Sequence, residues 1–201
     1  MATYTKNIQT QLITWADITN TNQTISSVVD VSTKLGALVL IHMGRRSGTA
    51  FTAGWPNLRV EVSGKASGND AWYPVQIFTP AIGASIANTT LNGAVSAAAT
   101  SCVVTSATNI AAGDILFLGH TTTVANYELV RVKSVSGTTV NFEEACTNAH
   151  DNTAPVTDQA EMYVCDLDLR DITRIRVVAD NANSGQTCAY EVSLITGDAI
   201  G

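Results

Sequence analysis

Three histidines and four cysteines are the residues that could hold a metal ion, and one pair of them has a suggestive spacing. Cys146 and His150 lie four positions apart, so a thiol and an imidazole could reach one ion. A zinc site usually takes its ligands from two closely spaced pairs, and the sequence offers no second pair. We therefore expect His150 to be a surface residue in a loop and His42 to be structural. No metal or other cofactor is expected.

The carboxylates do not form an acid–base pattern. Glu143 and Glu144 are adjacent, so in a strand they would point to opposite faces. Asp166 and Asp168 share one side of an extended segment and could bind calcium, but a solvated strand end beside Arg170 is the favoured interpretation. The glycine motifs of phosphate loops, nucleophile elbows and dinucleotide sites are absent. The sequence predicts no catalytic residues and no enzymatic activity.

Aromatic and basic residues are the candidates for contact with a partner. Trp55 follows a glycine, where it could contact a partner or anchor the loop. Trp15 and Trp72 are expected to pack in the core. Arg45 and Arg46 come nearest to a basic cluster, and a solvated loop is favoured there over an anion site.

The composition excludes several classes of protein and of partner. Of 201 residues, 45% are hydrophobic and 14% are charged, against roughly 25% charged in an average soluble domain. The chain has enough apolar residues to form a hydrophobic core, which excludes an intrinsically disordered chain. A net charge of −6 with 11 basic residues argues against nucleic acid as a partner. The longest apolar run has the length of a strand, and the N-terminus lacks a signal-peptide pattern, so we expect cytoplasmic synthesis and no membrane contact.

The four cysteines have no CxxC spacing and are expected to behave as small buried hydrophobic residues. Whether Cys165 and Cys188 form a disulfide stays open at this point.

Short alternating runs of apolar and polar residues predict strands in both flanks of the chain. Pro74 is expected at a sheet edge or bulge, since it cannot donate to a ladder. About eight strands are typical of a β-sandwich or jelly roll. They are expected over residues 11–15, 24–31, 37–43, 58–63, 72–79, 162–167, 173–178 and 187–194.

The middle of the chain predicts a second, smaller β unit. Strands are expected over 101–105, 115–118, 127–135 and 139–142, with a hairpin turn at Ser136 and Gly137. The fold class is therefore all-β: a β-sandwich or jelly-roll domain with an inserted small β-barrel-like domain. The sandwich is assigned to residues 1–90 plus 157–201, with a polar arm over 1–10, and the inserted domain to residues 91–156.

Two groups of segments resemble structural proteins of tailed bacteriophages. Residues 97–117 and 128–140 look like a small β module that recurs in such proteins. The flanks resemble the sandwich of phage virion proteins, including capsid decoration (cement) proteins. The flanking segments are residues 41–46, 59–68, 72–74 and 175–178.

This resemblance implies a non-enzymatic virion protein that binds the capsid exterior and stabilises it. Its implied partners are the major capsid protein and further copies of itself, as a homotrimer. A head-fibre, neck or tail protein is the first alternative, and a carbohydrate-binding β-sandwich module is the second. The expected contacts lie in the arm and in the loop after residue 44. They are Thr3, Tyr4, Lys6, Arg45, Arg46 and Trp55.

Overall fold

The structure is a computed structural model that describes residues 10–18, 23–48, 57–68, 71–79, 87–158, 160–180 and 186–198. In these ranges the regular elements are strands, apart from the short 3₁₀ turn η1 (Val124–Asn126). The predicted all-β class is confirmed. None of the described residues belongs to a helix long and apolar enough to cross a membrane.

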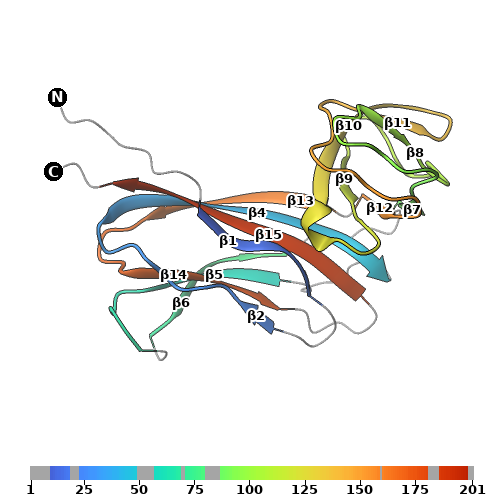
Figure 1. The fold of residues 1–201 in the computed structure, drawn as a ribbon. Helices are drawn as coiled ribbons and strands as arrows, with labels where there is room; N and C mark the ends of the chain where they lie inside the picture. Colours follow the sequence, from blue (N-terminus) through green and yellow to red (C-terminus); the bar gives the residue numbers. More distant parts are fainter. Residues whose placement is uncertain are drawn as a thin grey trace, which may run out of the picture.

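The first sheet is four-stranded and antiparallel, in the order β1-β15-β4-β13 (Figure 1). Its long central strand β4 extends beyond the run predicted from the sequence because β15 and β13 pair with it on both sides along most of its length. The strands are β1 (Thr10–Ile18), β15 (Gln186–Asp198), β4 (Lys34–Gly48) and β13 (Ala160–Asp168).

The second sheet has the order β2-β14-β5-β6, with β3 also paired to β14. Pro74 lies in the edge strand β6, beside a register shift, as predicted. The predicted strand over 24–31 is instead two short strands, because the Ser26 hydroxyl accepts the Val177 N–H and interrupts the ladder. The strands are β2 (Gln23–Ile25), β3 (Val29–Asp30), β14 (Arg174–Asp180), β5 (Asn57–Ser63) and β6 (Tyr73–Phe78).

These two sheets enclose one hydrophobic core and so form a sandwich. Alternate residues of β4 and β5 point into it, such as Ile41 and Met43 from the first sheet and Leu58 and Val60 from the second, all fully buried. The alternation visible in the sequence is therefore the inside–outside alternation of the sandwich.

The third sheet is six-stranded, in the order β7-β12-β9-β10-β11-β8, and encloses a core of its own. It lies at one end of the sandwich, against the first sheet (Figure 1). The predicted hairpin joins β10 to β11, with Gly137 at a φ of 59° in the tight turn. The strands are β7 (Asn88–Thr90), β8 (Ser101–Val103), β9 (Ile115–Leu118), β10 (Glu128–Ser136), β11 (Thr139–Phe142) and β12 (Pro155–Thr157).

A row of small residues joins the third sheet to the sandwich. Ala160, Gly44 and Ala189 are register partners across β13, β4 and β15, on the outer face of the first sheet. The ring of Phe117, from β9, sits on this row and is fully buried. An added Cβ at Gly44 would lie only 2.6 Å from the Phe117 ring, so this close approach requires glycine.

Arg45 corrects one sequence prediction. It was expected in a solvated loop as a partner contact, but it lies in β4 and is fully buried. Its guanidinium donates to the Ala87 carbonyl oxygen, which precedes β7, and faces the charge of Asp158, which follows β12. Burial lowers the pKa of Arg45, and Asp158 opposes that shift. Arg45 therefore binds the start of the segment that builds the third sheet and lies near enough to its end for the Asp158 charge to act on it.

All four cysteines are buried and free. In the sheet register, Cys165 on β13 lies opposite Val39 on one side of β4, whereas Cys188 on β15 lies opposite Arg45 on the other side. Because β4 lies between them, these two thiols do not form the disulfide left open above.

Candidate functional site

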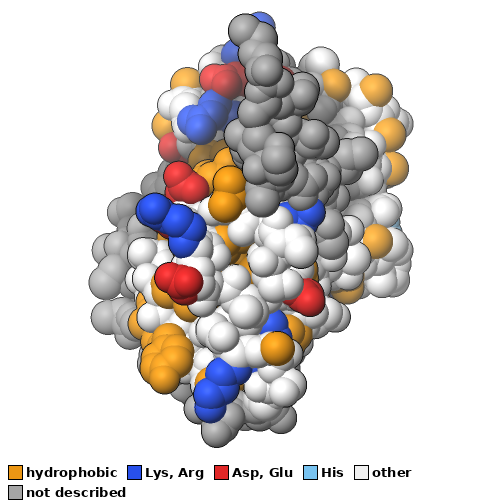
Figure 2. Space-filling view, turned by 90° about the vertical axis from the view of Figure 1, so that its left-hand side faces the viewer, with side chains coloured by type: hydrophobic (Ala, Val, Ile, Leu, Met, Phe, Trp, Pro, Cys, Tyr) orange, Lys and Arg blue, Asp and Glu red, His pale blue; other side chains and the backbone are white. Residues whose placement is uncertain are grey.

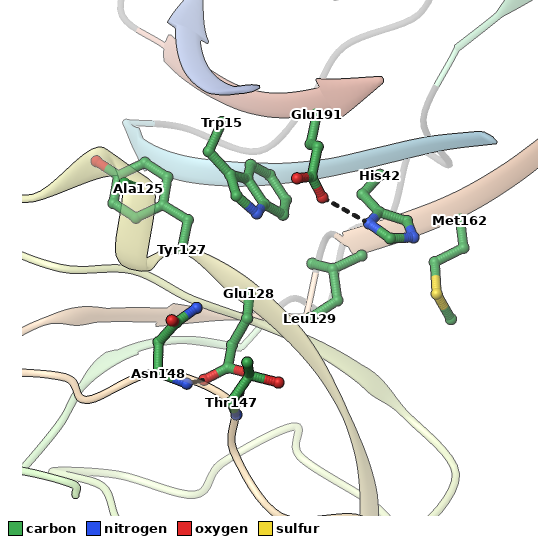
Figure 3. Close-up of a pocket in the computed structure, with 10 residues that line it drawn as sticks. All are labelled: Trp15, His42, Ala125, Tyr127, Glu128, Leu129, Thr147, Asn148, Met162 and Glu191. Carbon is green, nitrogen blue, oxygen red and sulfur yellow. Dashed lines mark hydrogen bonds and ion pairs between the residues drawn. The ribbon is translucent and has the colours of Figure 1, made fainter. Parts of the chain in front are cut away.

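A groove of about 320 Å³ opens where the third sheet meets the first sheet (Figure 3). One side comes from the outer face of the first sheet, with Trp15 on β1, His42 on β4 and Glu191 on β15. The other side comes from η1, the start of β10 and the segment after β11. The remaining lining residues are Ala125, Tyr127, Glu128, Leu129, Thr147, Asn148 and Met162.

An acid–imidazole pair forms one side of the groove. The Glu191 carboxylate lies 3.1 Å from Nδ1 of His42, and it also accepts a hydrogen bond of 2.6 Å from the Gln11 amide. The His42 ring stacks beside Trp15, with centroids 6.3 Å apart. His42 is thus held in the middle of β4, and its side chain remains 40% exposed toward the groove.

An aromatic cluster forms the adjoining wall. Trp15, Phe117 and Tyr127 contact one another edge-to-face, with ring centroids 5.1–6.1 Å apart. Trp15 was expected in the core, but it is half-buried and faces the groove. Burial, with the Asp17 charge, raises the pKa of Tyr127 to about 12, so its hydroxyl stays neutral at ordinary pH.

Arg46 lies beside this wall and, unlike the buried Arg45 next to it in β4, is partly exposed. Its guanidinium donates to Asp17 at 2.7 Å and lies 5.7 Å from the Tyr127 ring centroid. Burial raises the pKa of Asp17, and the Arg46 charge opposes the shift. Arg46 is 30% exposed, so of the two predicted arginines it alone is accessible to a partner.

The pair Cys146 and His150 acquires a third neighbour, Glu128. The candidate ligand atoms of these three residues all lie within 4.8 Å of one another. His150 was expected at the surface, but it is 2% exposed, and its Nε2 lies 2.6 Å from a Glu128 carboxylate oxygen. Burial and the Glu128 charge raise the pKa of the Cys146 thiol to about 11.

Glu128 connects this cluster to the groove. It begins β10, lines the groove, and accepts the backbone N–H groups of Thr147 at 2.8 Å and Asn148 at 3.2 Å. These contacts hold the segment after β11 against β10. The Cys146–His150 spacing was visible in the sequence, whereas Glu128 carries no local signal because a separate strand supplies it.

The structure does not describe the other predicted contacts. Thr3, Tyr4, Lys6 and Trp55 are outside the described residues. Trp72, expected in the core, is half-buried on the second sheet. The guanidinium carbons of Arg174 and Arg176 lie 4.8 and 4.3 Å from its ring centroid.

The end of the sandwich remote from the third sheet carries mixed charges. There the described acidic and basic side chains alternate among apolar ones (Figure 2). Hydrogen bonds from Arg170 lower the pKa of Asp168 to about 2, so this strand end is an exposed ion pair, in keeping with the favoured interpretation.

No family model matches this chain, and no curated protein matches it either.

The groove can hold a flat or elongated group by stacking and hydrogen bonding. Among its polar side chains, His42 and Glu191 are paired with each other, and Glu128 accepts from the backbone around it.

Proposed function

We propose that this chain is a non-enzymatic structural protein of a tailed-phage virion, which binds the outside of the capsid and stabilises it as a decoration protein. It is made in the host cytoplasm, contacts the major capsid protein and associates with two further copies as a homotrimer. The basis of the proposal is the resemblance expected from the segments named in the sequence, together with the outer face of the first sheet, which is its main structural support.

Beyond the groove, that outer face carries several large apolar side chains, with Asp166 and Ser193 among them. Met162 and Val164 on β13 share it with Leu38 and Leu40 on β4 and with Ile195 on β15, as the register shows. Met162 is 47% exposed and Val164 is 62% exposed. Large apolar side chains gathered on one exposed sheet face are typical of a surface that a partner covers.

The edge of the sheet adjoins this apolar area. Among the described strands, β13 pairs with β4 alone, so the backbone groups along its other edge can receive a further strand. A shell protein could therefore cover the apolar side chains and extend the sheet in one contact. Closed symmetry would multiply the effect of one such contact across a trimer.

Copy number in purified particles is the first test. Quantitative mass spectrometry should find this chain and the major capsid protein in a ratio near one. A ratio of a few per cent would overturn the decoration role in favour of a vertex, neck or tail position. Absence from the particles would overturn the virion role altogether and favour the carbohydrate-binding alternative.

A pair of variants tests the surface itself. Val164→Lys places a charge in the apolar area and should weaken binding to undecorated capsids at least tenfold, measured by co-sedimentation. Ile77→Lys is the matched control, because Ile77 is 52% exposed on the edge strand β6 of the other sheet. Equal binding by both variants would refute the assignment of this face.

A further inference from the structure

We propose that Glu128, Cys146 and His150 form a binding site for a zinc-like divalent transition-metal ion. The site lies in the third sheet and fastens the segment after β11 to the start of β10. It is independent of the capsid-binding proposal, because it concerns a different set of residues and a different ligand.

The orientation of His150 is the first argument. Its Nδ1 lies 2.7 Å from the Gly119 carbonyl oxygen, which can only accept, so Nδ1 carries the proton. Nε2 is then the atom that faces Glu128. A backbone carbonyl that fixes one ring nitrogen and leaves the other directed at a ligand set is the usual support for a metal-binding histidine.

The contact between His150 and Glu128 is the second argument. With the proton on Nδ1, a neutral Nε2 and a carboxylate oxygen would present two lone pairs to each other at 2.6 Å. A shared proton or a cation must therefore lie between these groups. A metal ion replaces that proton and satisfies both atoms.

The third ligand, Cys146, selects the kind of ion. Its thiol is buried, and its sulfur lies within 4.8 Å of the candidate ligand atoms of Glu128 and His150. One thiolate, one imidazole and one carboxylate are a ligand set that zinc accepts, whereas magnesium and calcium prefer oxygen alone.

Three protein ligands leave a fourth position of a tetrahedral ion for water or another donor. Glu128 also lines the groove, so the cluster adjoins that opening. The ion would join β10, the segment after β11 and the β-bridge residue His150, which are brought together only by folding. Metal binding should therefore stabilise the native state.

Titration of the full-length, chelator-treated and reduced protein tests the site. Cobalt(II) should bind one ion per chain and give the thiolate-to-metal charge-transfer absorption that a cysteine ligand produces. Zinc should displace it, and calorimetry should report the same stoichiometry of one ion per chain for zinc. Zinc should also raise the melting temperature.

Variants identify the ligands. Cys146→Ser should abolish the charge-transfer band, and His150→Ala should weaken cobalt binding at least tenfold. Cys165→Ala and His42→Ala are the matched controls, since Cys165 is buried in the sandwich core and His42 lies outside the cluster. Both controls should keep the wild-type stoichiometry and spectrum.

The wild-type titration decides the matter even if a ligand variant fails to fold. Absence of one-to-one binding by the wild-type chain overturns the proposal. So does a charge-transfer band that persists in Cys146→Ser, or one that is lost in Cys165→Ala.

Discussion

Replacing Gly44 by alanine should destabilise the protein through the contact between the first and third sheets. The new Cβ would lie 2.6–2.7 Å from three atoms of Phe117, closer than carbon atoms can approach. Phe117 is fully buried and is held by Trp15 and Tyr127, so its ring has little freedom to withdraw. Overpacking of this kind costs about 1–3 kcal/mol.

Gly36→Ala is the matched control on the same strand. An added Cβ there would meet only the Leu167 carbonyl oxygen, at the ordinary contact distance of 3.5 Å. Both substitutions add one methyl group to β4, so their difference isolates the contact with Phe117. Gly44→Ala should lower the melting temperature by roughly 2–4 °C for each kcal/mol lost in a chain of this size, whereas Gly36→Ala should leave it nearly unchanged.

A double-mutant cycle supplies the refuting result. Phe117→Ala by itself should cost about 3–5 kcal/mol because it empties a buried space. In that background the Gly44→Ala penalty should vanish, which gives a coupling energy of about 1–3 kcal/mol between the two positions. If urea unfolding shows that the two changes in unfolding free energy are additive, or if Gly44→Ala is as stable as Gly36→Ala, the proposed packing of the Phe117 ring on Gly44 is wrong.

Three further predictions concern buried groups. Arg45→Met removes the buried donor to the Ala87 carbonyl oxygen and should cost about 1–3 kcal/mol of unfolding free energy. Ser26→Ala removes the hydroxyl that accepts the Val177 N–H at 2.8 Å and should cost about 1–3 kcal/mol by urea denaturation. Burial raises the pKa of Cys188, so above about pH 8.5 the unfolded thiol ionises first and stability falls as pH rises, by up to about 1.4 kcal/mol per pH unit. Burial also raises the pKa of Cys102, Cys146 and Cys165, so Cys188→Ala should reduce this slope by up to about 1.4 kcal/mol per pH unit without abolishing it, and an unchanged slope would contradict the assignment.

The strand pattern of the sandwich could be predicted because it is local. In β5, Leu58, Val60 and Val62 alternate with Arg59 and Glu61, which correctly predicts the face that enters the core, although Glu61 on the other face is also buried, paired with Arg176. The hairpin at Gly137 and the edge position of β6 follow from single residues, a glycine at positive φ and a proline without a donor.

The burial of Arg45 could not be predicted in the same way. A dipeptide of two arginines at the end of an apolar run indicates a solvated turn. Arg45 is buried because Ala87 and Asp158, both distant in sequence, meet over β4 and provide an acceptor and an opposing charge. Arg46, the next residue, remains partly exposed.

The sequence by itself determined the all-β class, most of the strands and the spacing of Cys146 and His150, since these depend on the two-residue period of a strand and on neighbours along the chain. Only the tertiary structure decided that Glu128 lies beside Cys146 and His150, and that the Phe117 ring packs against Gly44. These contacts join segments from different sheets or distant parts of one sheet. Their geometry depends on strand register and sheet packing, which no local pattern specifies.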